Sequence, residues 1–257
     1  MKYLQMAAAA LLLVMGACQK DPSTDPSTAQ SKPPAKAKQL MAIEYRGLNS
    51  SGATFEYDSK GRVTKVADGE DVATYKYTGN EVEISEWRIA ENREVFKFKG
   101  KLNADGNLYE GTATSNYSQS FVYQQKHTYE YTTDGYLAKA TMSRDNGDLY
   151  EYIYHYKGGH LIRQDNYRNG ALDYAFYWEY SSGNPDKSGL NVYAFVPTNK
   201  CLGKPGTELW TKYTLKRPGV ADQVTTATYT VDAAGYATVQ KVNDAQNRTY
   251  EVLYRYE

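Results

Sequence analysis

The chain has 257 residues, with 30 basic and 30 acidic side chains and a formal net charge of zero. Proteins whose main partner is nucleic acid usually carry a basic face, so this balance argues against that class of partner. Only two cysteines are present, Cys18 and Cys201. We predict that Cys18 carries lipid, which leaves no cysteine pair for an intramolecular disulfide.

Residues 1–17 are typical of a bacterial lipoprotein signal peptide. A lysine near the start supplies positive charge, an apolar run extends from Ala7 to Met15, and two small residues, Gly16 and Ala17, precede Cys18. The run is shorter than the roughly 20 residues that a transmembrane helix needs. We therefore expect the mature chain to begin at Cys18, with lipid on its sulfur and on the new N-terminus. An ordinary secretory signal peptide is the alternative.

Residues 18–40 are predicted to be a disordered tether rich in proline, serine and lysine. The sequence Asp-Pro-Ser-Thr occurs twice in succession, at 21–24 and 25–28, and two adjacent prolines follow at 33–34. Because the segment has almost no large apolar side chains, it cannot offset the entropy lost on ordering. We expect it to hold the folded domain away from a membrane.

Residues 41–257 are predicted to form one antiparallel β domain. No proline occurs between Met41 and Asn184, which suits hydrogen-bonded strands because proline removes a ladder donor. The later prolines, between 185 and 218, predict long loops, with strands resuming after Gln223. No segment of the domain shows a sustained helical pattern of apolar residues.

An aromatic-x-aromatic pattern recurs along the domain. In six of the seven cases the middle residue is charged, so one face of each strand is aromatic and the other polar. Several intervening turns open with an Asp, Asn or Thr and close with a glycine, as in Asp58–Gly61, which is typical of three-residue hairpin loops. Together these features predict a meander of about 12 to 16 strands. The pairs are Phe55/Tyr57, Tyr75/Tyr77, Phe96/Phe98, Tyr129/Tyr131, Tyr154/Tyr156, Trp178/Tyr180 and Tyr254/Tyr256.

Two aromatic stripes are the candidate ligand-contacting residues. In one interpretation they are cross-strand ladders that stabilise the sheet, each pair by roughly 0.2–1 kcal/mol. In the other, some of the rings line a groove or lumen where a sugar or peptide stacks, since a tyrosine hydroxyl requires a partner or water. The stripes are Tyr150, Tyr152, Tyr154 and Tyr156, and Tyr174, Phe176, Trp178 and Tyr180.

The sequence contains no motif that predicts catalysis, a metal or a cofactor. His155 and His160 are five residues apart across a Gly-Gly turn, which is not a usual zinc spacing. The segment from Arg144 to Asp148 lacks the spaced ligands of a calcium loop and favours a hairpin turn. Nucleophile-elbow, phosphate-loop and dinucleotide fingerprints are absent. We therefore expect no enzyme activity and no cofactor.

The whole mature chain resembles a family of lipoproteins of Bacteroidetes-type bacteria. The resemblance rests on the lipidation motif, the polar tether, the repeated Tyr-x-Tyr hairpins, the late loop Leu202–Pro205 and the terminal Tyr254–Tyr256. That family has no assigned function and is described as having a porin-like β fold. It implies an open or flattened β-barrel at the bacterial outer membrane, and it supplies no catalytic or binding residues.

We therefore expect a non-enzymatic, lipid-anchored envelope domain that binds a ligand or partner, such as a glycan or peptide. A purely structural envelope protein and, third, a polysaccharide hydrolase are the alternatives. A membrane-spanning barrel is disfavoured because the face opposite the aromatic rings is charged. Residues 18–21 resemble only weakly an acidic surface-export signal, so the cell surface and the periplasm both remain open as locations. Cys201 is interpreted as a buried, inert thiol.

Overall fold

The computed structural model describes residues 38–47, 52–118, 120–187, 202 and 208–257. The predicted signal peptide, Cys18, most of the tether and Cys201 lie outside these residues. The described chain forms sixteen β-strands and no α-helix. Within this part of the chain, nothing has the helical length and apolar character that a membrane-crossing helix requires.

The strands follow one another along the chain and have 5 to 15 residues each. Their bounds are β1 (Leu40–Arg46), β2 (Ala53–Tyr57), β3 (Val63–Ala67), β4 (Asp71–Thr78), β5 (Glu81–Arg88), β6 (Arg93–Leu102), β7 (Leu108–Ser118), β8 (Phe121–Tyr131), β9 (Leu137–Arg144), β10 (Leu149–Lys157), β11 (His160–Arg168), β12 (Ala171–Pro185), β13 (Glu208–Arg217), β14 (Val220–Val231), β15 (Ala237–Asn243) and β16 (Thr249–Tyr256).

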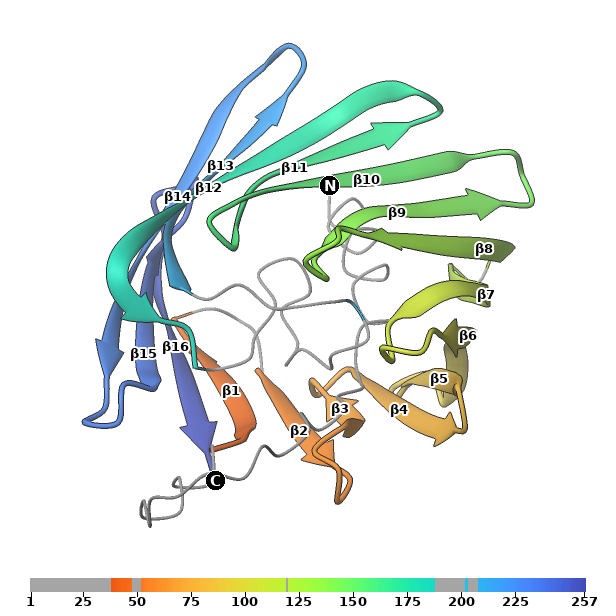
Figure 1. Cartoon of the computed structure of the whole chain (residues 1–257), viewed down its shortest axis with the longest axis horizontal. Helices are drawn as coiled ribbons and strands as arrows, with labels where there is room; N and C mark the ends of the chain where they lie inside the picture. Colours follow the sequence, from red (N-terminus) through yellow and green to blue (C-terminus); the bar gives the residue numbers. More distant parts are fainter. Residues whose placement is uncertain (1–37, 48–51, 119, 188–201, 203–207) are drawn as a thin grey trace.

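The sheet closes into a barrel (Figure 1). Each strand pairs antiparallel with its neighbours in the sequence, and β1 also pairs with β16, where Ile43 lies opposite Tyr254. The prediction of an all-β meander with 12 to 16 strands is confirmed, although the barrel is closed rather than open or flattened. Closure gives every strand a partner on both sides, so the described sheet has no free edge for another strand to join.

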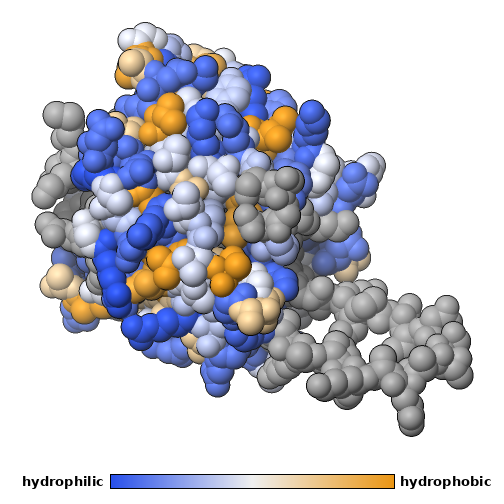
Figure 2. All heavy atoms as spheres, turned by 90° about the vertical axis from the view of Figure 1, so that its left-hand side faces the viewer, coloured by the Kyte–Doolittle hydropathy of each residue, from blue (hydrophilic) through white to orange (hydrophobic). Residues whose placement is uncertain are grey.

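The predicted alternation sets the inner and outer faces of the barrel. Its inner face holds the first ring of six aromatic pairs, and the charged middle residues, such as Glu56 and Lys97, are exposed outside. Figure 2 shows a mainly hydrophilic outer surface on one side, with hydrophobic residues in small separate groups. The inward rings are Phe55, Tyr75, Phe96, Tyr129, Tyr154 and Trp178, all buried in one hydrophobic core.

A recurring hydrogen bond explains why the second ring is so often tyrosine. In four pairs its hydroxyl donates to the backbone carbonyl of an apolar residue that is the first or second residue of the preceding strand. A buried tyrosine hydroxyl requires such a partner, so the ring fills space while its tip is satisfied. The bonds are Tyr57 to Leu40 (2.5 Å), Tyr77 to Val63 (3.1 Å), Tyr131 to Leu108 (2.7 Å) and Tyr180 to Leu161 (2.8 Å).

The predicted turns form as expected and lie at one end of the barrel. In the first, Asp58 accepts hydrogen bonds from the backbone of Lys60 and Arg62, and Gly61 has a φ of +74°. We call this end the tether end, because Gln39 and Glu257 exchange two backbone hydrogen bonds there. The opposite end, with the β3–β4, β5–β6 and β15–β16 connections, is the far end.

Two predicted boundaries differ from the structure. Strand β1 begins at Leu40, one residue inside the segment predicted to be tether, because Leu40 is buried in the core. Strands also resume at Glu208 rather than after Gln223. The prolines at 205 and 218 lie beyond the two ends of β13 and do not interrupt it, so their clustering in the sequence concealed a strand.

The Tyr131 hydroxyl offers a test of the recurring bond. Tyr131→Phe removes the donor and leaves the Leu108 carbonyl with one partner fewer, so we expect the free energy of unfolding to fall by about 1–3 kcal/mol. Urea denaturation followed by circular dichroism measures this value. The matched control is Tyr109→Phe, since Tyr109 is 40% exposed. Equal effects of the two substitutions would contradict a specific role for the hydrogen bond.

Candidate functional site

Both predicted aromatic stripes lie on the inner wall of the barrel. The first follows β10 and the second follows β12, and β11 separates them. Between the stripes, β11 contributes two buried amides, Gln164 opposite Tyr154 and Phe176, and Asn166 opposite Tyr152 and Tyr174. The Gln164 amide donates to the Asn166 side chain at 2.8 Å. The structure therefore joins the two stripes into one wall.

The rings of this wall mostly pack against protein. Tyr154 and Trp178 belong to the buried core, and Tyr152, Tyr156, Phe176 and Tyr180 pack against it. Phe176 lies 5.4 Å from Trp178 and 5.6 Å from Tyr174, measured between ring centroids. This packing is what a stabilising ladder requires.

The space beside the first stripe is small. A cavity of about 20 Å³ is lined by Tyr152, Tyr154 and His127, which is enough for about one water molecule. At the far end of the same stripe, the Tyr150 hydroxyl accepts a hydrogen bond from Arg144 and donates to Asp148. Contact between these eight stripe residues and a ligand stays a prediction.

A larger cavity, of about 70 Å³, lies on the other side of the barrel. Strands β1, β13, β15 and β16 form it, and three aliphatic side chains complete its walls. We call it the aromatic cavity. Its lining extends along the wall from Tyr45 and Tyr250, which lie near the far end, to Trp210, which lies nearer the tether end. Its polar and aromatic lining consists of Tyr45, Trp210, Tyr213, Gln240, Tyr250 and Tyr254.

The Gln240 side chain is held in one orientation within the aromatic cavity. The Tyr254 hydroxyl donates to Gln240 Oε1 at 2.6 Å, and Gln240 Nε2 donates to the Tyr229 hydroxyl at 2.9 Å. An amide has two donor hydrogens and two acceptor lone pairs, so one of each is left for a further partner. The site therefore presents a fixed donor and a fixed acceptor side by side.

Four other rings of the aromatic cavity have polar atoms without a protein partner. In the described part of the chain, no hydrogen bond is made by the hydroxyls of Tyr45, Tyr213 and Tyr250 or by the indole N–H of Trp210. The rings contact one another, with centroids 6.4 Å apart for Tyr45–Tyr250 and 5.3 Å apart for Trp210–Tyr213. Burial, together with the nearby Tyr213 and Tyr45 hydroxyls, raises the pKa of Tyr250 to about 12. The Tyr250 hydroxyl is therefore neutral at physiological pH.

Sequence reasoning missed this cavity. Tyr45 and Trp210 are 165 positions apart in the sequence, and no local sequence pattern links them. They meet only because β1 pairs with β16 and β13 lies three strands further along the wall. The terminal Tyr-x-Tyr pair was the one available signal, since its first ring, Tyr254, lines the cavity.

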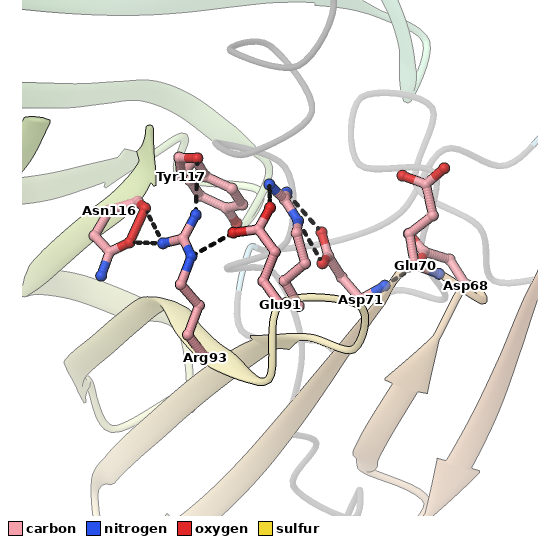
Figure 3. A network of polar contacts seen from close by, with 8 residues as sticks. Asp68, Glu70, Asp71, Glu91, Arg93, Asn116 and Tyr117 are labelled. Carbon is pink, nitrogen blue, oxygen red and sulfur yellow. Dashed lines mark hydrogen bonds and ion pairs between the residues drawn. The ribbon is translucent and has the colours of Figure 1, made fainter. Parts of the chain in front are cut away.

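A polar network occupies the far end near β4–β7 (Figure 3). Asp71 accepts two hydrogen bonds from the Arg88 guanidinium, at 3.0 and 3.2 Å. Arg93 donates to Glu91, to Asn116 and to the Tyr117 backbone carbonyl (Figure 3), and Glu91 also lies 3.7 Å from the Arg88 guanidinium. Acidic and arginine side chains thus alternate along this network, in the order Asp71, Arg88, Glu91 and Arg93.

Glu86 lies beside this network with its carboxylate unpaired. It is 0% exposed, and neither of its side-chain oxygens nor the nearby Tyr117 hydroxyl makes a hydrogen bond. Burial raises the pKa of Glu86 to about 8, and the negative charges of Asp71 and Asp68 act in the same direction. The Tyr117 hydroxyl and Arg88 act in the opposite direction but do not outweigh burial. Glu86 is therefore mostly protonated at neutral pH.

The described residues offer little to catalysis or metal binding. They contain no group of three or more His, Cys, Asp or Glu side chains that could hold a metal ion. Burial lowers the pKa of His127 to about 4, and the Arg144 charge adds to this, so its imidazole stays neutral. Its Nε2 contacts Gln125 at 3.1 Å. The other two described histidines contact carboxylates, His155 Nε2 with Asp165 at 3.0 Å and His160 Nε2 with Glu208 at 3.7 Å.

The chain matches no family model and no curated protein. Among solved structures it is similar to the crystal structure of a porin-like protein from Bacteroides uniformis ATCC 8492, with 20% identity and a TM-score of 0.64 over 85% of this chain and 96% of that one. A porin-like protein from Bacteroides vulgatus ATCC 8482 is similar too, with 15% identity and a TM-score of 0.64 over 86% and 99%. At these identities the likeness shows the fold alone, a porin-like β-barrel. Membership of the lipoprotein family stays a prediction.

Glu86 makes stability depend on pH. The unfolded carboxyl ionises near pH 4.5, whereas the folded one stays protonated up to about pH 8. The folded state therefore binds more protons between these values, and the free energy of unfolding falls as pH rises through this window. We expect Glu86→Gln to remove this slope and to raise stability at pH 7 by on the order of 3 kcal/mol.

Urea denaturation from pH 4.5 to 9 measures this effect. The matched control is Glu83→Gln, which changes an exposed carboxylate on the outer face of the same strand. If both variants keep the pH slope of the natural protein, Glu86 ionises freely in the folded state and this interpretation is wrong.

Proposed function

We propose that the protein is a lipid-anchored, non-enzymatic domain of the bacterial envelope that binds a ligand or partner. In this proposal the barrel lies outside the bilayer, and Cys18 carries the only membrane attachment. The observation that carries the proposal is the charge of the outer wall. A barrel with a porin-like fold but a charged outer wall is poorly suited to insertion in a bilayer.

Ion pairs link neighbouring strands around most of the outer wall. A spanning barrel needs a lipid-facing apolar band, and a lysine or arginine facing lipid costs about 2–4 kcal/mol at the bilayer midplane. The pairs would therefore oppose insertion at many positions of the wall. They include Lys65–Glu56 (2.8 Å), Lys101–Glu110 (2.8 Å), Lys139–Glu151 (2.6 Å), Lys212–Glu179 (2.7 Å) and Arg255–Glu44 (2.8 Å).

The interior supports binding rather than conduction. Sixteen-stranded porins enclose a water-filled channel, whereas here the inward side chains form one hydrophobic core with contributions from around the barrel. Leu202, which belongs to none of the strands, is also buried in that core. The aromatic cavity of about 70 Å³ is much narrower than a channel would be.

The tether leaves the barrel at one end, so the opposite end would face away from the membrane. Lys38 and Glu257 both lie at the tether end, where Lys38 Nζ contacts Asp232 at 2.7 Å. A tether of about 20 residues attached there has a typical span of about 25 Å as a flexible chain. The Arg88–Asp71 network would then face away from the lipid anchor, and the aromatic cavity would lie along the wall between the two ends.

A purely structural envelope protein is the second candidate. The packing of Tyr152, Tyr154 and Trp178 within the inner wall favours it, since these rings would then serve stability alone. A hydrolase has no such support among the described residues. The two leading candidates differ in whether a ligand occupies the barrel, which the experiment in the next subsection examines.

The anchor is tested by replacing Cys18. When Cys18→Ala is exported from a signal peptide with an ordinary cleavage site, we expect the protein to leave the membrane fraction, because the barrel wall has no lipid-facing band. For the natural protein we expect a diacyl or triacyl mass on a chain that begins at Cys18, measured by intact mass spectrometry.

Two results would contradict the proposal. One is a Cys18→Ala protein that resists carbonate extraction from membranes, since the barrel would then be inserted. The other is a natural chain without lipid. Protease shaving of whole cells then decides the location: loss of the lipidated chain places it on the surface, and protection places it in the periplasm.

A further inference from the structure

We propose that the aromatic cavity binds one residue of a neutral sugar. The inference deepens the proposed ligand-binding function and rests on it. Its support is the combination of aromatic faces, unpartnered polar tips and neutral lining that Tyr45, Trp210, Tyr213, Tyr250 and Gln240 provide in one place.

The lining favours a neutral ligand. All the described residues that bound the cavity are aliphatic, aromatic or amide side chains, and none is charged. A charged group loses its hydration when it enters such a site and gains no ion pair in return, which costs far more than the burial of a neutral polar group. Phosphates, carboxylates and ammonium groups are therefore poor occupants.

The polar tips favour a ligand with several hydroxyls. Among the described residues, the Tyr45, Tyr213 and Tyr250 hydroxyls have no hydrogen-bond partner, so they remain available to water or to a ligand. A purely apolar ligand would displace water from these groups and return no hydrogen bonds. A pyranose ring presents an apolar C–H face to an aromatic ring and hydroxyls around its edge, so it meets both kinds of surface at once.

The Gln240 amide is already oriented for hydrogen bonding to a ligand. Tyr254 and Tyr229 hold its amide from both sides, so the remaining donor and acceptor are already oriented before a ligand arrives. A group that is fixed in advance loses less conformational entropy on binding. A side-by-side donor and acceptor matches two adjacent hydroxyls of a sugar ring.

The fold disfavours a peptide strand as the occupant. Peptides that bind β proteins often add a strand to an exposed sheet edge, and the pairing of β1 with β16 closes the described sheet. The cavity volume of about 70 Å³ equals several water sites. It admits part of one ring, so we expect the terminal residue of a glycan to enter while the rest of the chain stays outside.

The test measures binding of oligosaccharides to the full mature chain. Separate titrations use maltohexaose, cellohexaose, xylohexaose and laminarihexaose as neutral probes, with a galacturonic acid hexamer and a pool of random hexapeptides in parallel. Isothermal calorimetry gives the affinity. The chain has three tryptophans, so the part of the fluorescence change that is lost in Trp210→Ala reports on Trp210. We expect at least one neutral probe to bind at millimolar concentration or below, and neither charged sugars nor peptides to do so.

Substitutions locate the bound probe. Trp210→Ala should weaken binding about tenfold or more, as the loss of a central aromatic contact typically does. Tyr213→Phe and Tyr250→Phe keep the rings and remove only hydroxyls, so each should weaken binding by about two- to tenfold. The control is Trp87→Ala, which removes a tryptophan that is 45% exposed on the outer wall and should leave affinity unchanged. If Trp210→Ala fails to fold, the two tyrosine variants still decide the matter.

Three other results would contradict the sugar-binding inference, and they differ in what they imply for the proposed ligand-binding function. Neutral sugar binding that is indifferent to all three cavity substitutions would place the site elsewhere and refute this inference. Binding of the acidic hexamer or the peptides alone would refute it and leave the proposed ligand-binding function intact. No binding in any arm would count against both, and the structural alternative would then be preferred.

Discussion

A closed wall of sixteen strands encloses more space than aliphatic side chains can easily fill, and this requirement accounts for much of the molecule's chemistry. A tyrosine ring reaches further from the backbone than valine or leucine does, but its hydroxyl then needs a partner inside the barrel. At Tyr57 and Tyr131 that partner is the carbonyl that begins the preceding strand. At Tyr45 and Tyr213 no group among the described residues takes this role, which is why we propose a ligand there.

The wall has the opposite polarity to that of a membrane pore. Lysines and acidic residues pair across strands on its outer face, and rings pack on its inner face. A likeness to porin-like structures at 15–20% identity therefore describes the path of the backbone and leaves open which solvent each face meets. The buried Glu86 is an exception inside the wall, since it places a carboxyl where its neighbours are rings.

The sequence contains the local features of the fold and lacks the long-range ones. Period-2 alternation and turns such as Asp58–Gly61 are encoded within a few residues, so the strands and their two faces were predictable. Closure was not, because the pairing of Ile43 with Tyr254 depends on the summed tilt and stagger of all the strands between them. The aromatic cavity follows from closure and was missed for the same reason. Glu86 could have been noticed, since it follows Val82 and Ile84 at the inward-facing alternate positions of one strand and is the only one of the three that is polar.

The pairing of β1 with β16 also affects the order of folding steps. The first strand cannot complete its hydrogen bonds until more than 200 further residues are available, and contacts between such distant residues slow the search for the native state. A chain that crosses a membrane unfolded and N-terminus first would expose the edge of β1 until the eight residues of β16, Thr249–Tyr256, had emerged. An early attachment to a membrane surface would keep neighbouring unfinished chains apart during that interval.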